Sequence, residues 1–178
     1  MQKKDSRKSD KKLVLISIIT LFALAIFGLV FYKILSKSES VEREKMVLAS
    51  EFKNTNGEQI KLSEKTTDDE FVEYFENLVK EKKDFVLYVA LPFCSGDSAK
   101  FKEYVLDFQR KNHLSFYYLT SDYVKDTSVY ETVKYFPAVI IYKDGKILNY
   151  LKYDSDEDVK YYKSYDGFSK WMRENVEF

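Results

Sequence analysis

The chain begins with a polar segment that is followed by one long apolar run. Residues 13–32 read LVLISIITLFALAIFGLVFY and contain no charged side chain. At about 1.5 Å per residue, a helix of this length spans roughly 30 Å, the thickness of a bilayer core. A buried core helix is the alternative, but no other part of the chain is large enough to surround it. The pattern predicts a tail over 1–12, a transmembrane helix over 13–35, a linker over 36–45 and a folded domain over 46–178.

Beyond the linker, apolar residues follow helical and strand spacing in turn. A hairpin is predicted over 51–63, because Asn56-Gly57 is a strong turn signal between apolar flanks. Thr67 and Glu70 match a capping box before an amphipathic helix. The run FVLYVAL is apolar on both faces of a strand, which is typical of a central strand covered on both sides.

The rest of the chain continues this alternation. The pattern predicts a helix around 101–108, a strand over 114–119, a short helix over 128–135, a strand-turn-strand unit over 138–151 and a last helix from about residue 166. Strands that alternate with helices predict an α/β domain with a central mixed sheet, helices on both faces and an antiparallel edge.

Charge distribution adds an orientation to this picture. The 178 residues include 29 basic and 29 acidic side chains, and this zero net charge argues against nucleic acid as a partner. Residues 1–12 hold six basic and two acidic side chains, while the remainder holds 23 basic and 27 acidic ones. Because positive residues stay on the cytoplasmic side, the pattern predicts a single-pass membrane protein with an extracytoplasmic domain. A cleaved signal peptide ending near Ser36-Lys37-Ser38 is the alternative.

The composition excludes several kinds of site. One cysteine and one histidine leave no internal disulfide, Cys-rich cluster or multi-histidine metal centre. Asp154-Ser155-Asp156-Glu157-Asp158 begins like a calcium loop, but Val159 and Tyr165 stand where that loop needs glycine and glutamate. We therefore expect neither a metal nor another cofactor, and we read His113 as an ordinary surface or hinge residue.

Two features point to a family. Cys94 follows the buried strand where a helix begins, and Pro137 lies 43 residues later at the start of FPAVIIYKDGK. This order resembles the thioredoxin fold, with Cys94 at the position of the attacking cysteine and Pro137 at that of the cis proline. The plan of a short anchor, an exported domain and a degenerate site is similar to thioredoxin-like bacteriocin-transport accessory proteins of Gram-positive bacteria.

The departures from the family pattern concern the active site. In this alignment with the family, Asp97 stands in place of the resolving cysteine, and Phe93 stands in place of the tryptophan that usually precedes the first cysteine. Tyr88 stands in place of the buried acid on the preceding strand, and Ala138 stands in place of the common threonine after the cis proline. Residues 152–165, KYDSDEDVKYYKSY, form a longer connection than the family has, and we call them the insert.

The candidate site comprises five residues. A helix N-terminus lowers the pKa of a thiol such as Cys94, whereas the carboxylate of Asp97 opposes this effect and is also a good helix cap. The resemblance further implies that Phe93, Phe136 and Pro137 bind an extended protein or peptide partner. Cys94 is either a weakly activated thiol or an inert buried cysteine.

Two functions follow from these residues. The leading hypothesis is a membrane-anchored accessory or binding module that is not a dithiol oxidoreductase, since a second thiol is needed to release a mixed disulfide. The alternative is monothiol exchange by Cys94 with an external thiol. A group of tyrosines in and beside the insert is read either as a partner surface or as ordinary sheet and loop residues; these are Tyr150, Tyr153, Tyr161, Tyr162 and Tyr165.

Overall fold

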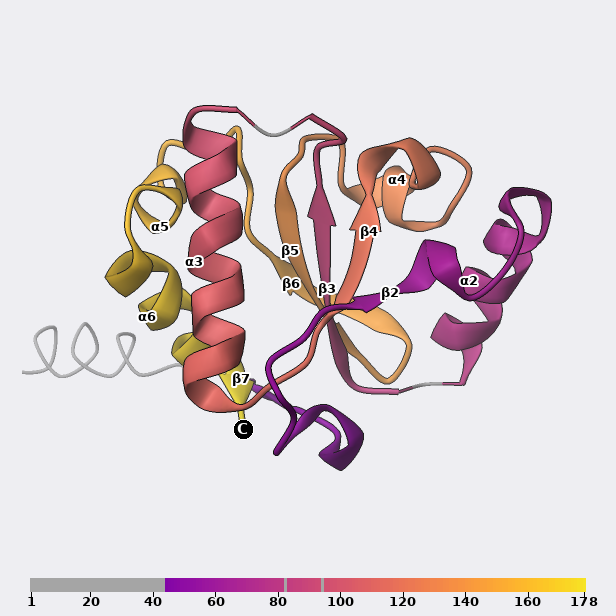
Figure 1. The fold of residues 1–178 in the computed structure, drawn as a ribbon, viewed down its shortest axis with the longest axis horizontal. Coiled ribbons are helices and arrows are strands. Elements are labelled where there is room, and N and C mark those ends of the chain that lie inside the picture. Colours follow the sequence, from indigo (N-terminus) through magenta and orange to yellow (C-terminus); the bar gives the residue numbers. More distant parts are fainter. Residues whose placement is uncertain (1–43, 82, 94) are drawn as a thin grey trace, which may run out of the picture. The chain divides into compact units, whose positions relative to one another are not determined.

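Five strands form the central sheet of the domain in a computed structural model (Figure 1), which describes residues 44–81, 83–93 and 95–178. The strands lie in the order β2-β4-β3-β5-β6. In sequence order the elements are β1 (Met46–Val47), β2 (Ile60–Lys61), α2 (Phe71–Lys80), β3 (Phe85–Ala90), α3 (Asp97–Asn112), β4 (Tyr117–Thr120), α4 (Val129–Thr132), β5 (Ala138–Lys143), β6 (Lys146–Tyr150), α5 (Val159–Tyr162), α6 (Tyr165–Asn175) and β7 (Val176–Glu177).

The directions of the strands define the fold. β2 and β3 both pair in parallel with β4, while β5 pairs antiparallel with β3 and β6 antiparallel with β5. Helices α3, α5 and α6 lie on one side of the sheet, and α2 and α4 lie on the other (Figure 1). The mixed sheet between two helical layers confirms the thioredoxin-like fold expected for the soluble part.

The central strand is buried on both faces, as the apolar run predicted. All six residues of β3 are buried. On one face the Phe85 ring stacks on Tyr142 at 4.6 Å, and Tyr142 meets Phe75 of α2 edge-on at 6.5 Å. On the other face Tyr88 meets Phe101 of α3 at 6.1 Å. These aromatic contacts join both helical layers to one strand, and such pairs add stability beyond the burial of apolar area.

The hairpin predicted over 51–63 is wrong. Ser50–Phe52 forms a 3₁₀ turn, and Ile60–Lys61 pairs in parallel with β4 instead of folding back on its own flank. Gly57 has a φ of +74°, and a Cβ there would lie 2.5 Å from the Cα of Arg110. The glycine therefore permits close packing of this loop on α3, which the local pattern did not reveal.

Two further differences concern helix starts and the insert. The capping box is absent, since the Thr67 side chain accepts no backbone hydrogen bond and its hydroxyl donates to the Glu70 carboxylate at 3.0 Å. A 3₁₀ turn, Asp68–Glu70, precedes α2. The insert, predicted as a loop, contains the short helix α5, and its tyrosines pack inward in part.

The first and last strands of the described chain pair with each other. β1 and β7 form a separate two-stranded parallel sheet, in which Met46 is opposite Val176. Neither strand was predicted, because two-residue strands show no periodicity. The predicted tail and transmembrane helix lie outside the described residues, within which no helix is long and apolar enough to cross a bilayer.

Candidate functional site

Two connecting loops meet at one end of the central sheet. Val89 near the end of β3 pairs with Ala138 at the start of β5. The loop after β3 and the Phe136-Pro137 segment before β5 are therefore neighbours, near the N-terminus of α3 (Figure 1). The fold thus brings the predicted residues Phe93, Phe136 and Pro137 to one end of the domain, while Cys94 lies outside the described residues.

Phe93 is the most exposed large apolar side chain of the described chain, at 92%. It belongs to an irregular segment that leads into α3. Gly96 precedes the helix with a φ of +56°, and a Cβ at this position would meet no atom within 4 Å, so the backbone conformation, rather than space, favours glycine. An aromatic ring exposed to this degree gains little from burial.

Asp97 does not cap α3, contrary to the prediction. Gly96 is the N-cap, and Asp97 is the first helical residue without a side-chain cap bond. The local bonds are made by Ser98, whose hydroxyl accepts from the Ser95 amide at 3.3 Å and donates to the Ser95 carbonyl at 2.8 Å. The exposed Asp97 carboxylate still interacts favourably with the positive end of the helix.

The peptide bond between Phe136 and Pro137 is cis, as predicted. Pro137 is buried, whereas Phe136 is half-buried and the preceding Tyr135 is 57% exposed. Among the described residues, neither the N–H nor the C=O of Phe136 forms a backbone hydrogen bond. These groups are available to an extended polypeptide.

Tyr162 of α5 reaches this segment from the helical layer. Its hydroxyl lies 3.0 Å from the Pro137 carbonyl and 2.7 Å from the Leu151 carbonyl, and the side chain is 6% exposed. Burial, with a smaller contribution from the Asp158 carboxylate, raises the pKa of the Tyr162 hydroxyl above its ordinary value. The hydroxyl thus keeps its proton and shares this single donor between the two carbonyls.

Tyr88 is the residue that the resemblance aligns with the family's buried acid. This side chain is fully buried, and its ring also lies 5.9 Å from that of Tyr118. A phenol supplies no carboxylate for proton transfer to a thiol.

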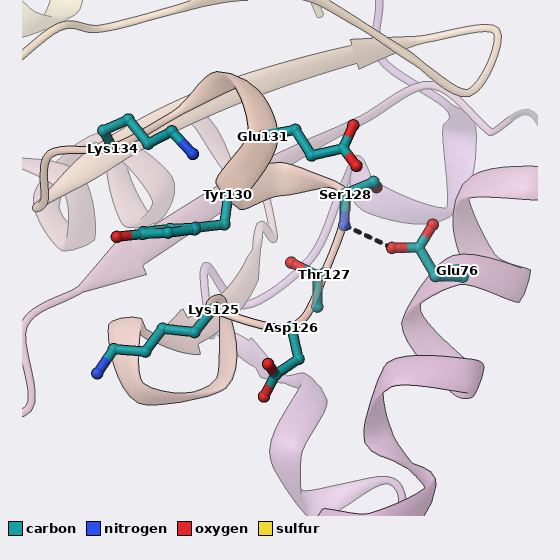
Figure 2. Close-up of a pocket in the computed structure, with 8 residues that line it drawn as sticks. All are labelled: Glu76, Lys125, Asp126, Thr127, Ser128, Tyr130, Glu131 and Lys134. Carbon is teal, nitrogen blue, oxygen red and sulfur yellow. Dashed lines mark hydrogen bonds between the residues drawn. The ribbon is translucent and has the colours of Figure 1, made fainter.

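Two hollows flank the segment before Pro137. One of about 300 Å³ is lined by Thr132, Lys134, Tyr135, Tyr150, Lys152 and Asp154. Figure 2 shows the other, of about 420 Å³, where Glu76 accepts a hydrogen bond from the Ser128 amide at 2.7 Å; it is lined by Glu76, Lys125, Asp126, Thr127, Ser128, Tyr130, Glu131 and Lys134. Both hollows mix lysines with carboxylates, so neither favours one sign of ligand charge, and no group of potential metal ligands occurs among the described residues.

Sequence reasoning missed the role of Tyr162 and the exposure of Tyr135. The insert's tyrosines do not form one surface, because Tyr162 is buried whereas Tyr153 is exposed. A buried tyrosine next to acidic loop residues has no distinguishing local pattern. Only its distance from Pro137 in space identifies it. His113 is exposed and is the C-cap of α3, with a φ of 55°, which agrees with its reading as an ordinary surface residue.

No family model and no curated protein matches the chain. Solved structures that resemble it include a mutant thioredoxin from Halobacterium salinarum, with 10% identity, 70% of this chain and 96% of that chain covered, and a TM-score of 0.47. A putative oxidoreductase with a thioredoxin fold has 20% identity, coverage of 60% and 94%, and a TM-score of 0.40. Thioredoxin from Aeropyrum pernix has 19% identity, coverage of 64% and 87%, and a TM-score of 0.36.

Proposed function

We propose that the chain is a membrane-anchored, extracytoplasmic accessory protein whose thioredoxin-like domain binds an extended polypeptide. The observation that carries this proposal is that the exposed Phe93 and the Phe136 backbone, which has no backbone partner among the described residues, lie on two loops at the same end of the sheet. An aromatic anchor next to available backbone donors and acceptors suits strand-like recognition, in which the backbone provides affinity and the ring specificity. The membrane supplies the second partner, through the single predicted span.

Dithiol oxidoreduction is excluded by counting cysteines. After the first thiolate attacks a substrate disulfide, a second thiol in the same chain must release the mixed disulfide. The sequence contains one cysteine, and Asp97 occupies the place of the second. A carboxylate forms no disulfide, so the release step has no internal reagent.

Monothiol exchange is the second candidate function. The Cys94 thiolate would attack one sulfur of a substrate disulfide, form a mixed disulfide and expel the other sulfur as a thiolate. A low-molecular-weight thiol would then attack the Cys94 sulfur, release the substrate as its thiol and remain bound to Cys94 in a second mixed disulfide. Another molecule of the same thiol would attack the small-thiol sulfur of this disulfide, which returns Cys94 as a thiolate and releases the low-molecular-weight disulfide. The candidate is favoured by the order of the sequence, in which Cys94 comes shortly before α3, because a thiol near a helix N-terminus is more easily ionised.

Reduction of insulin disulfides separates the two functions. With glutathione as the external thiol, we expect the full chain in detergent to give the same rate as its Cys94→Ser variant. A Cys94-dependent rate would overturn the binding-module proposal in favour of monothiol exchange. The pH profile of Cys94 alkylation is a second measurement, because a thiol pKa at or above that of free cysteine contradicts an activated thiolate.

Binding is tested by a photoreactive residue placed at position 93 on intact cells. We expect a defined crosslinked protein from this position and none from position 47, where Val47 is 52% exposed at the other end of the domain. Equal crosslinking from both positions would contradict a specific site. Identification of the captured protein also tests the narrower proposal, based on overall plan, of a role in bacteriocin transport.

The predicted topology has its own test. Protease added to intact cells should digest the domain, and protection of the domain would reverse the orientation. Extraction only by detergent supports the anchor. A mature protein that begins near residue 39 and stays soluble would instead support the cleaved signal peptide.

A further inference from the structure

The insert supplies a buried hydrogen-bond donor to the site. Tyr162 is the last residue of α5, and its hydroxyl is within hydrogen-bond distance of two carbonyls that belong to different strands' ends, Pro137 before β5 and Leu151 after β6. The Leu151 amide in turn donates to the Val139 carbonyl at 2.9 Å. One hydroxyl therefore holds together the two chain segments that enter and leave the β5–β6 pair.

The Tyr162 ring is itself held by two aromatic neighbours. Its ring centroid lies 4.3 Å from that of Phe101 on α3 and 5.2 Å from that of Tyr153 at the start of the insert. The insert is closed by a hydrogen bond of 3.0 Å from the Lys152 amide to the Asp158 carboxylate. The ring of Tyr162 is thus fixed against α3 and the insert, while its hydroxyl contacts the Pro137 carbonyl.

The two residues before β5 differ in whether their backbone groups have a hydrogen-bond partner. The Pro137 carbonyl is occupied by this hydroxyl, whereas the neighbouring N–H and C=O of Phe136 have no backbone partner among the described residues. A partner that pairs with Phe136 gains most when this backbone is already ordered, because less conformational entropy is lost on binding.

We propose that Tyr162 is a positioning residue for the polypeptide-binding segment at Phe136. The proposal rests on the proposed function, in that this segment is the one that meets the partner. Without the hydroxyl, the Pro137 and Leu151 carbonyls lose their donor, and Phe136 samples more than one conformation while the rest of the fold persists. The insert, absent from the usual family connection, is the element that supplies this residue.

The test uses the full chain in detergent micelles with ¹⁵N-labelled phenylalanine. The chain has 14 phenylalanines, and the Phe136 amide signal is assigned by its loss in Phe136→Leu. We expect Tyr162→Phe to shift or broaden the Phe136 signal and to leave Phe75 on α2 unchanged. An unchanged Phe136 signal would overturn the proposal.

Tyr142→Phe is the matched control. Tyr142 is also buried, but its hydroxyl has no hydrogen-bond partner in the described part of the chain, and its ring contacts Phe75 and Phe85. This variant should affect signals near those rings and leave Phe136 in place. If both variants move Phe136 equally, the effect is general loosening and the positioning role is refuted.

A second variant covers the case in which Tyr162→Phe fails to fold. Asp158→Ala removes the carboxylate that accepts from the Lys152 amide and leaves the core intact. We expect a smaller shift of the Phe136 signal in the same direction, and no shift would contradict the proposal.

Capture of a partner provides the functional readout. Crosslinking from position 93 should fall roughly fivefold in Tyr162→Phe, as expected for the loss of one ordering hydrogen bond. If Phe136 is perturbed but capture is unchanged, Tyr162 orders the segment without serving the partner, and the proposal fails. If position 93 captures nothing in any chain, the proposed function fails, while the nuclear magnetic resonance result still reports on Tyr162.

Discussion

The two ends of the central sheet differ in how completely their polar groups are satisfied. At one end, which we call the closed end, the Asp84 carboxylate accepts from the Asp144 amide at 2.9 Å, and Lys143 forms an ion pair with Glu44. The same end carries the β1–β7 pair, extended by a bond of 2.9 Å from the Leu48 amide to the Glu177 carbonyl. The first and last strands of the described chain thus support each other.

The other end, which we call the open end, carries Phe93, Phe136 and Pro137. Here an aromatic ring is 92% exposed, and the backbone of Phe136 is without backbone hydrogen-bond partners among the described residues. Backbone groups without a protein partner and an exposed apolar ring add little to the stability of the domain, in contrast to the groups at the closed end. The two ends therefore differ in how many of their groups stabilise the fold, and under the proposed function the open end is the one that meets the partner.

The largest effect is expected at the closed end. Met46→Asp places a charge at a fully buried position in β1 and should lower the free energy of unfolding by roughly 3 kcal/mol or more. Val47→Asp is the matched control. Val47 is the next residue on the same strand and is 52% exposed, so the change should cost about 0.5 kcal/mol or less. Urea denaturation measures the free energy of unfolding of both variants. Equal decreases would show that β1 does not stabilise the domain through the burial of Met46.

Alkaline pH should weaken the domain through one buried tyrosine near each end. Burial raises the pKa of Tyr142, next to Lys143, and of Tyr162, above the ordinary value of 10.0. Because the unfolded chain loses these protons near pH 10 and the folded chain retains them, the stability present at neutral pH falls as the pH rises above 10. The loss per tyrosine is up to about 1.4 kcal/mol per pH unit.

Single variants assign this pH dependence to each end. Tyr142→Phe and Tyr162→Phe should each reduce the slope of unfolding free energy against pH above 10. At neutral pH, Tyr162→Phe should cost about 1 kcal/mol because two carbonyls lose a donor, whereas Tyr142→Phe should be close to neutral. An equal cost at neutral pH would contradict the difference in hydrogen bonding between the two hydroxyls.

The smallest effect on stability is expected at the open end. Phe93→Ser removes a ring that makes little contact with the rest of the domain, so the free energy of unfolding should change by about 0.5 kcal/mol or less. Crosslinking of a partner from a photoreactive residue at Phe136 should nevertheless be lost. A large loss of stability would mean that Phe93 serves packing and not recognition.

Much of the fold could be predicted from local pattern. The apolar run of β3, the helical spacing of α2 and α3 and the strand-turn-strand unit of β5 and β6 all appear where expected, because burial on one or two faces imposes its period on the sequence. Two residues of the candidate site, Phe93 and Pro137, were also identifiable from their order along the chain.

The errors have a common cause. Asn56-Gly57 is typical of a hairpin turn, but Gly57 serves close packing against Arg110, which lies 53 positions further along the chain. Asp97 is typical of a helix cap, yet the backbone of Gly96 begins the helix. In both cases the residue type permits several local roles, and contacts distant in sequence choose among them.

By itself, the sequence determined what chemistry is possible: one cysteine excludes a dithiol cycle regardless of structure, and the apolar periods require an α/β domain. Only the tertiary structure decided which polar groups form hydrogen bonds within the described part of the chain and which do not. The Pro137 carbonyl lies 3.0 Å from a hydroxyl 25 residues away, while Phe136 beside it has no backbone partner among the described residues. Hydrogen-bond satisfaction depends on distances between segments, and the order of residues does not encode those distances in any short pattern.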